Sequence, residues 1–347
     1  MKSATIRFRV YLSLCCALLL AACGGGGGGG GADSSGGGGN PPAPTGITYT
    51  GSTTPATLTS GNAGTMADSA YQGTTPGQTA GGAALNTTRP EHRGLVGLAD
   101  ALARAGIGAG DSTAQSSATS RAIANFTGTL QGTCNGLPQG TASGISGTYD
   151  NVTGAFTATV TLINFRACDG TLNGSATVTG NIDIATGWLK DFILSFTTLT
   201  YTEASYNWTL SGSIAYASPV FSGNRTTTIN LTYLDNTTSK VYKIENLVLV
   251  FTENGPADNV TINGRFYHPD HGYVDLTTTV PITLTYVSRF PTQGTLVLTG
   301  QGNRKVRITF VFNGTYSYNL GLDANGDGTY EQTATCSWVT GCGAFTP

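Results

Sequence analysis

The chain has 347 residues, a formal net charge of −2 at pH 7 and only 10% charged residues. With 17 Lys and Arg residues in all, it offers no basic patch of the kind that binding to nucleic acid or to anionic lipid heads requires. The low charge, together with 50 glycines and many threonines, serines and asparagines, is typical of an exported β-rich protein. The length allows one large domain or two modest ones.

Residues 1–22 have the layout of a signal peptide. Basic residues at the start precede an uncharged apolar run over 10–20, which is shorter than the ~20 residues that a transmembrane helix needs. The run ends in Leu20-Ala21-Ala22-Cys23, which resembles the lipobox of bacterial prolipoproteins. The resemblance implies that Cys23 is diacylated and becomes the first residue after cleavage. An ordinary secretory signal that ends in a cysteine is the alternative.

The resemblance also implies a destination, because Gly24 stands where an aspartate would resemble a signal for retention in the inner membrane. We therefore expect a lipid anchor in the outer membrane. Residues 23–46 are rich in glycine and proline and cannot bury enough apolar surface to offset the entropy of ordering them. They are predicted to form a disordered tether that holds the folded part on the order of 25 Å from the lipid surface.

The cysteine count predicts two disulfides. Of the seven cysteines, two leave with the signal peptide and Cys23 carries lipid, so Cys134, Cys168, Cys336 and Cys342 remain. An even number in an oxidising compartment indicates disulfides, and three connectivities are open. Closeness in sequence favours Cys134 with Cys168 and Cys336 with Cys342. A zinc site is the alternative, but the spacing does not fit one and no histidine is near.

Residues 47–121 are predicted to be partly helical and to pack on a sheet. The first helix is expected over Ser60 to Tyr71, with Ser60 as N-cap and Gly73 as the stop. A second is expected to open at Pro90 and to end at Gly106. Its apolar residues recur at helical spacing, and its polar face lacks the lysine-rich strip of a helix that lies on a membrane. Those apolar residues are Leu95, Leu98, Leu102 and Ala105.

Residues 122–347 change to the period of two that β-strands show. Phe156, Ala158, Val160 and Leu162 alternate with threonines, and about a dozen such runs are separated by turn signals. The predicted fold is mainly β: a long antiparallel meander that forms a curved sheet, a sandwich or an unclosed barrel, with one or two short N-terminal helices.

A weak repeat of the form Thr-(Leu/Ile)-x-Gly occurs four times in this region, ending at Gly132, Gly174, Gly212 and Gly264. It predicts β-bulges or close approaches of the backbone at these glycines. Because the intervals are uneven, a regular propeller or solenoid is disfavoured.

The sharpest local motif runs from Asp323 to Glu331. Oxygen-bearing side chains at positions 1, 3 and 5, with glycine at 6, allow a tight loop to wrap a calcium ion. Ala334 at position 12 departs from the EF-hand. The motif also resembles the calcium loops of integrin-type propeller blades, whose last acidic ligand is at position 9. The predicted ligands are Asp323, Asn325, Asp327, Thr329 and Glu331, in a structural calcium site; the alternative is a hairpin turn that binds no ion.

A second cluster comprises His268, Asp270, His271, Tyr273 and Asp275. Two of the three histidines of the chain lie here, which raises a metal site or acid-base chemistry as a hypothesis. The spacing matches no zinc or nucleophile signature, and a solvated surface loop is the alternative reading.

The sequence identifies no catalytic residues, since it contains no nucleophile elbow and no phosphate-binding loop. The favoured hypothesis is a membrane-anchored, non-enzymatic binding or structural lipoprotein of the cell envelope that contacts a glycan, a lipid or a protein. The first alternative is an envelope hydrolase that uses carboxylates or the His268–Asp275 cluster. The second is a carrier of lipid or lipoprotein built on an open β-barrel, which predicts an apolar cavity between sheet and helix.

Overall fold

A computed structural model describes the folded part of the chain, and all described residues belong to one compact unit, Ala43–Pro347. The described ranges are 46–81, 98–99, 101–108, 123–134, 137–166, 170–203, 206–218, 224–254, 257–285, 291–311, 317–337 and 341–346. The predictions for the signal peptide, for Cys23 and for nearly all of the tether lie outside them. In the described part, no helix combines the length and the apolar character that crossing a membrane would need.

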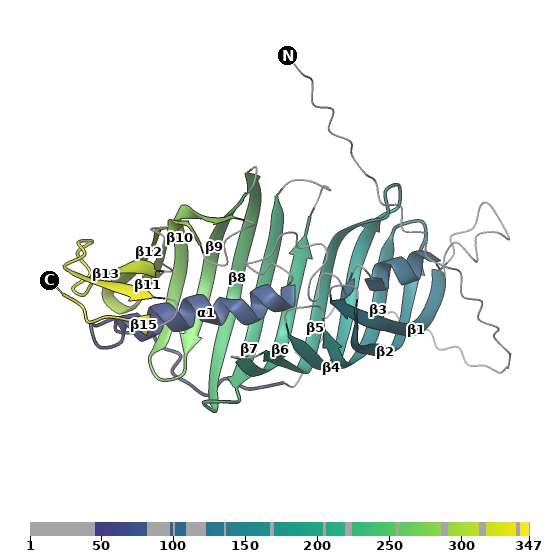
Figure 1. The fold of residues 1–347 in the computed structure, drawn as a ribbon, viewed down its shortest axis with the longest axis horizontal. Helices are drawn as coiled ribbons and strands as arrows, with labels where there is room; N and C mark the ends of the chain where they lie inside the picture. The colour runs from purple at the N-terminus through teal and green to yellow at the C-terminus, as the bar shows by residue number, and fades with distance from the viewer. Residues whose placement is uncertain are drawn as a thin grey trace, which may run out of the picture. The chain divides into compact units, whose positions relative to one another are not determined.

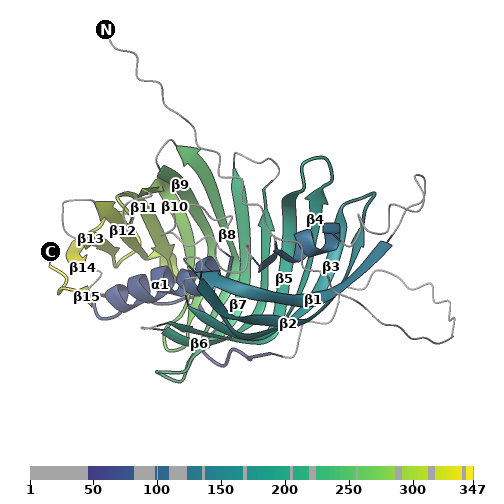
Figure 2. The same cartoon turned by 45° about the vertical axis from the view of Figure 1, so that its right-hand side comes forward.

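Fifteen strands form one antiparallel sheet in which each strand pairs with its neighbours in sequence (Figure 1). Among the described residues β1 does not pair with β15, so the sheet is not closed and the predicted mainly β meander is confirmed. Figure 2 shows its curvature. The strands are β1 (Ile123–Cys134), β2 (Leu137–Asp150), β3 (Ala155–Arg166), β4 (Thr171–Asp183), β5 (Trp188–Glu203), β6 (Tyr206–Ala217), β7 (Arg225–Asp235), β8 (Lys240–Asn254), β9 (Ala257–His268), β10 (Gly272–Thr285), β11 (Gln293–Thr299), β12 (Lys305–Val311), β13 (Ser317–Asp323), β14 (Gln332–Ser337) and β15 (Gly341–Cys342). A short 3-10 helix, η2 (Gln301–Asn303), joins β11 to β12.

The alternating sequence separates an inward and an outward face. In β3, buried and exposed residues alternate almost without interruption, and Phe156, Ala158, Val160 and Leu162 all point inward. The same alternation occurs in β7 and β12. The inward residues form one continuous apolar core with the helices, as the hydrophobic effect requires of a sheet with one solvated face.

Helix α1 (Ala63–Gly81) begins later than predicted. The Asn62 side chain accepts a hydrogen bond from the Thr59 N–H at 2.9 Å and donates one to the Thr57 carbonyl at 2.9 Å. These bonds fix a turn ahead of the helix, so the helix starts after Asn62 and not after Ser60. The prediction of Ser60 as N-cap is therefore wrong.

The prediction that Gly73 ends this helix is also wrong, because α1 continues through it. A Cβ at Gly73 would lie 2.5 Å from Cε2 of Phe266 and 2.7 Å from Oη of Tyr233. Glycine is needed here because the helix backbone rests directly on two core rings. Met66, Ala67 and Ala70 on the same helix are completely buried.

The second helical segment comprises residues 98–99 and 101–108, while Pro90 and Leu95 lie outside the described residues. Leu98 and Leu102 are buried against the sheet, as the helical spacing predicts. The helix does not end at Gly106. A Cβ there would lie 3.0 Å from Cβ of Tyr149 on β2, so this glycine too marks a close helix-to-sheet contact.

Three of the four glycines of the weak repeat occupy close backbone approaches, as predicted, and nothing tests the prediction for Gly132. Gly174, Gly212 and Gly264 have φ values of +133°, +134° and +151°. A Cβ on them would lie 2.1 to 2.5 Å from backbone atoms of the neighbouring strand. Register shifts occur in many of the strand pairs, and bulges of this kind bend and twist the strands that contain them. Their recurrence explains why the sheet curves.

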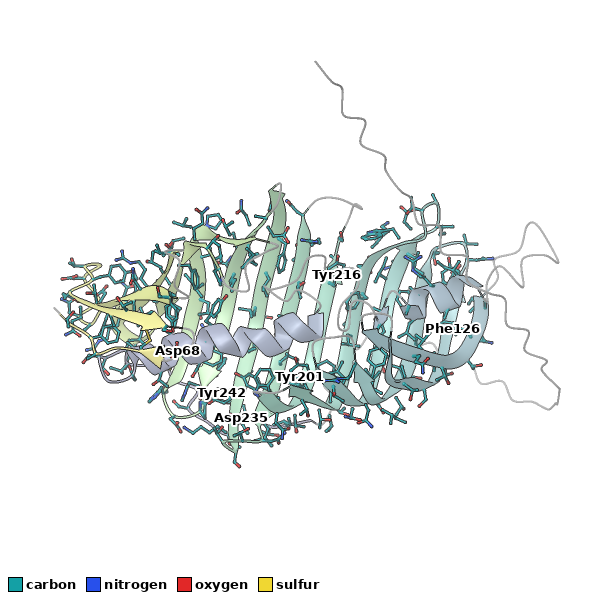
Figure 3. The ribbon with its side chains drawn as sticks, in the orientation of Figure 1. Asp68, Phe126, Tyr201, Tyr216, Asp235 and Tyr242 are labelled. Atoms are coloured by element: carbon teal, nitrogen blue, oxygen red, sulfur yellow. A yellow bond between two sulfur atoms is a disulfide. The ribbon has the colours of Figure 1, made fainter. Side chains whose placement is uncertain are left out.

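Aromatic rings form a ladder along the inward face, from β5 to β9. Tyr201 stacks on Trp208 with centroids 5.7 Å apart, and Tyr233 stacks on Tyr242 at 5.0 Å. Trp208 joins the two pairs at 6.0 Å, and Tyr242 continues to Phe266 at 6.0 Å. Figure 3 labels Tyr201 and Tyr242 in this row. Helix α1 rests on two rings of this ladder, Phe266 and Tyr233, at Gly73.

Residues 46–58 form a strap that precedes α1 and bonds to the β9–β10 hairpin and to η2. Ala56 N–H donates to the Tyr273 carbonyl at 2.8 Å, and Tyr273 N–H donates to the Thr54 carbonyl at 2.9 Å. Further along, Gln301 N–H donates to the Ala56 carbonyl at 2.8 Å. The strap therefore ties the β9–β10 hairpin to η2 before the chain turns inward to α1.

Candidate functional site

The outward face of β3, β4 and β5 contains a shallow hollow of about 310 Å³. No charged residue lines it. Thr159, Thr177 and Ser195 face one another across the three strands in one register row. The hydroxyls around the hollow, two from each strand, belong to Thr159, Thr161, Ser175, Thr177, Ser195 and Thr197. Each can both donate and accept hydrogen bonds.

Bulges position these hydroxyls. The pairing of β2 with β3 shifts between Ser143 and Ser146, next to the hollow, and β4 with β5 shifts beside Gly174. The Thr159 hydroxyl donates to the Ser146 carbonyl at 3.3 Å, and the hydroxyls of Thr161 and Ser175 lie 3.4 Å apart. The hydroxyls are thus held by neighbouring strands, while their remaining donors and acceptors face outward.

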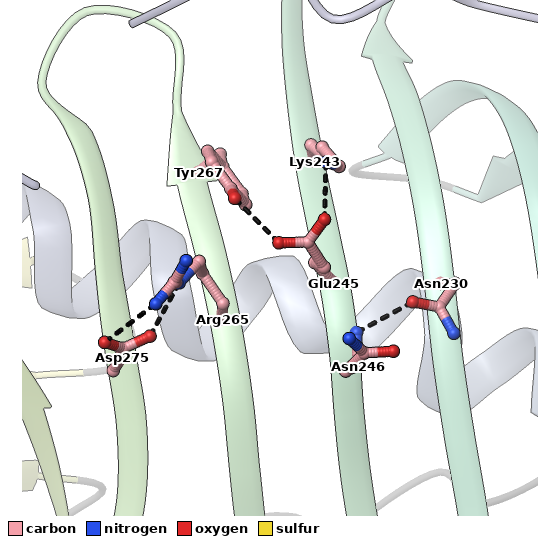
Figure 4. Close-up of polar contacts among 7 residues, drawn as sticks. All are labelled: Asn230, Lys243, Glu245, Asn246, Arg265, Tyr267 and Asp275. Atoms are coloured by element: carbon pink, nitrogen blue, oxygen red, sulfur yellow. Dashed lines mark hydrogen bonds and ion pairs between the residues drawn. The ribbon is translucent and has the colours of Figure 1, made fainter. Parts of the chain in front are cut away.

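A second polar group lies on the outward face of β8, β9 and β10, turned away from α1 (Figure 4). Lys243 pairs with Glu245 at 2.8 Å, and the Tyr267 hydroxyl donates to Glu245 at 2.7 Å. Arg265 binds both oxygens of Asp275, at 2.7 Å and 3.1 Å. In this network each charged group has an opposite charge as its partner.

The electrostatics of the network do not suit proton transfer. The hydrogen bond from Lys243 makes the largest contribution to lowering the pKa of Glu245, and the hydrogen bond from Tyr267 makes the next largest. The hydrogen bond to Asp275 raises the pKa of Arg265, so the guanidinium stays charged. A general acid needs a carboxyl group whose pKa is raised towards the working pH, and Glu245 is shifted in the opposite direction. The arrangement is that of a rigid, polar binding or packing surface.

The structure brings together the predicted cluster around His268 at the β9–β10 turn. His268 is 2% exposed, and its Nδ1 accepts the Asp270 N–H at 3.1 Å. Its ring stacks on that of His271 with centroids 4.6 Å apart, and Asp270 forms an ion pair with Lys240. Burial, with a smaller contribution from His271, lowers the pKa of His268 to about 4. Its imidazole is therefore neutral near pH 7 and supports the turn.

Tyr273 and Asp275, the remaining members of this cluster, belong to the polar network of β8–β10 and not to the turn. The Arg265 guanidinium, which binds Asp275, also lies 3.9 Å from the ring centre of Tyr273. The sequence cluster therefore divides into two groups with different partners.

The Asp323–Glu331 loop connects β13 to β14 and brings its three carboxylates together. One oxygen from each of Asp323, Asp327 and Glu331 lies within 4.8 Å of the others. Calcium binds oxygens at 2.3–2.6 Å, so oxygens on opposite sides of one ion are separated by up to about 5 Å. The spacing fits a calcium ion.

Backbone hydrogen bonds hold this loop in shape. Asp323 is fully buried and accepts the N–H groups of Gly326 at 2.7 Å and Gly328 at 2.9 Å. Asn325 accepts the Asp327 N–H at 2.8 Å, and the hydrogen bond from Thr329 N–H is the main reason that the pKa of Asp327 is lowered. The same bonds would close a turn without an ion, so calcium remains a prediction.

The structure joins Cys336 to Cys342 by a disulfide, as their spacing predicts, across the β14–β15 pair. The predicted partner of Cys134 is Cys168, which lies outside the described residues.

Sequence reasoning did not find the hydroxyl hollow or the Lys243–Asp275 network. The alternating sequence predicts that these threonines point outward. Which of them are neighbours across the sheet depends on strand register and on bulges, which the sequence does not show.

Comparisons with protein-family models, with curated proteins and with solved structures find no match. The fold and the sites define a class of protein built on one open antiparallel sheet. Helices cover the inward face of this sheet, and polar sites lie on its outward face.

Proposed function

We propose that this protein is a lipid-anchored, non-enzymatic protein of the cell envelope whose outward surface binds a neutral glycan. The observation that carries the proposal is the hollow on β3–β5, which hydroxyls from three strands line without any charge. Sugars present hydroxyls that both donate and accept hydrogen bonds, and an uncharged hydroxyl-lined surface matches that chemistry. The lipobox supports an acyl anchor on Cys23 in the outer membrane, with the tether between anchor and sheet.

Two features favour this reading over the alternatives. The inward face is packed directly against α1, since Gly73 touches core rings and Met66 is fully buried, which argues against a lipid cargo at that position. His268 and Glu245 both have pKa values shifted away from those of a general acid near neutral pH. Binding through the outward face needs neither a cavity nor a catalytic group.

The proposal is tested with the full-length protein, purified in detergent, by affinity electrophoresis in gels that contain neutral envelope polysaccharides. A double variant, Thr159→Val with Thr177→Val, keeps the shape of the hollow but removes two hydroxyls. We expect it to bind about thirtyfold more weakly, because the two lost hydrogen bonds contribute roughly 1 kcal/mol each.

Thr179→Val is the matched control, since it removes an exposed hydroxyl from β4 outside the hollow and is expected to leave binding unchanged. Absence of binding to neutral polysaccharides, or equal binding by the double variant and the wild type, would refute the proposal.

A further inference from the structure

A second hollow, of about 350 Å³, lies on the outward face at the other end of the sheet. It spans β12, β13 and β14, and the C-terminal residues beside β14 form one wall. Unlike the neutral hollow on β3–β5, this one is lined by a positively charged side chain, that of Arg307. The polar side chains that line it are Arg307, Thr309, Asn319, Thr333, Thr335 and Thr346.

Strand register places these side chains in two rows. Arg307, Gly321 and Thr333 form one row, and Thr309, Asn319 and Thr335 form the next. The Thr335 hydroxyl donates to the Asn319 side-chain oxygen at 3.2 Å, which fixes the second row.

The C-terminal wall is held by backbone bonds. Thr333 and Thr346 exchange two hydrogen bonds, at 2.7 Å and 2.8 Å. Backbone hydrogen bonds therefore join each segment that lines the hollow to the next one.

The first row contains a gap that an aromatic ring fills. Gly321 has no side chain, and a Cβ there would lie 3.1 Å from Cδ1 of Tyr330. The Arg307 guanidinium lies 4.1 Å from the centre of the same ring. Tyr330 therefore supports the Arg307 guanidinium from one side by a cation–π contact.

Arg307 lacks the anionic partner that Arg265 and Arg225 have. Arg265 binds Asp275, and Arg225 binds Asp258 at 2.9 Å. Within the described residues no carboxylate pairs with Arg307, and its Nε is buried without a hydrogen-bond partner. Arg225 also has an Nε without a partner, so the feature that marks Arg307 is the missing carboxylate, which an anion from solution can replace.

We propose that this hollow binds a carboxylate-bearing sugar, with Arg307 holding the carboxylate and Thr309, Asn319 and Thr335 holding hydroxyls of the ring. A guanidinium matches a carboxylate through two parallel hydrogen bonds, and hydroxyl and amide groups match the remainder of a sugar acid. The volume falls at the lower end of the range of small-molecule sites.

A carboxylate is favoured over a phosphate for two reasons. The hollow supplies a single positive charge, and Tyr330 belongs to the loop that brings Asp323, Asp327 and Glu331 together nearby. That negative field penalises a dianion more than a monoanion. This site is distinct from the hollow on β3–β5, so either proposal can fail while the other holds.

The experiment titrates the full-length protein with glucuronate, with its neutral amide glucuronamide and with inorganic phosphate, by isothermal calorimetry or saturation-transfer NMR. We expect glucuronate to bind at least about tenfold more tightly than the other two. Arg307→Gln should weaken glucuronate binding by a similar factor and leave glucuronamide unchanged. Lys305→Gln is the matched control, because it removes the same charge from the same strand outside the hollow, and it should change affinity less than about twofold.

Melting curves of each variant show whether it folds. If Arg307→Gln does not, Arg307→Lys keeps the charge but loses the planar fork, and Thr335→Val removes one ring contact; both should weaken binding. Failure of glucuronate to bind, tighter binding of phosphate, equal binding of glucuronamide, or full affinity in the Arg307 variants would overturn the proposal. Loss of neutral-polysaccharide binding in the Thr159 and Thr177 double variant has no bearing on this result.

Discussion

Replacing Gly73 by alanine tests how α1 rests on the sheet. Local propensity alone favours the change, because alanine is about 1 kcal/mol better than glycine inside a helix. Packing opposes it. The added Cβ would lie 2.5 Å from Cε2 of Phe266 and 2.7 Å from Oη of Tyr233, where ordinary contacts begin at 3.4 Å. The helix or the rings must therefore shift by about 1 Å.

The rings have little room to shift. Phe266 and Tyr233 are 1% and 4% exposed, and both belong to the aromatic ladder. Overpacking of a core costs roughly 1–3 kcal/mol, and two rigid buried neighbours place this case near the upper end. After the gain in propensity, Gly73→Ala should lose about 2 kcal/mol. For a domain of this size that corresponds to a fall in melting temperature of about 4 °C.

Thermal melting followed by circular dichroism provides the measurement, and Gly108→Ala provides the control. Gly108 is the last described residue of the second helical segment, and nothing lies within 4 Å of the position of its added Cβ. That variant should melt at or slightly above the wild-type temperature. If Gly73→Ala is stabilised as much as Gly108→Ala, the helix does not rest on the ladder as described.

Three further outcomes are expected. Cys23→Ser should release the protein from the membrane fraction, and intact-mass analysis of the wild type should find a diacylated Cys23 as the first residue. Calcium at about 10 mM should raise the melting temperature by about 3 °C in the wild type and in His271→Ala but not in Asp327→Asn; equal responses of all three proteins would indicate a bare turn. Because the pKa of His268 is about 4 when folded and near 6.5 when unfolded, its contribution to stability is present above pH 6.5 and is lost as the pH falls towards 4, by about 3 kcal/mol in all. His268→Asn retains an acceptor for the Asp270 N–H, so urea unfolding between pH 7 and pH 4 should show a flatter pH dependence than in the wild type; an unchanged slope would contradict this account.

The fold could be predicted because its main signal is local. Alternation such as that from Phe156 to Leu162 defines a strand and its buried face without any knowledge of its partners. Turn signals between successive runs then favour pairing in sequence order, which is what the sheet shows.

The errors arose where one residue type serves two purposes. Gly73 and Gly106 look like helix stops from the sequence, because glycine is common just after a helix. Their actual use is to let a helix backbone approach Phe266 or Tyr149, and that use depends on rings far along the chain. No local pattern distinguishes the two roles.

The sites could be predicted only in part, for a related reason. The Asp323–Glu331 loop is continuous in sequence, so its convergence of carboxylates was visible in advance. The surroundings of Arg307 come from three strands and the C-terminal segment, and the hydroxyl hollow depends on bulges that each move the register by one residue. Side-chain neighbours across a sheet are set by pairing, which composition and spacing do not reveal.

The topology also separates the two hollows energetically. Every strand pairs only with its neighbours in sequence, and six strands lie between β5 and β12. The apolar core lies on the inward face, so it does not connect the side chains of the two outward hollows. Substitutions more than about 10 Å apart that share no partners add independently. Changes around Thr177 and around Arg307 should therefore combine without coupling, which allows one sheet to hold a neutral site at one end and a charged site at the other.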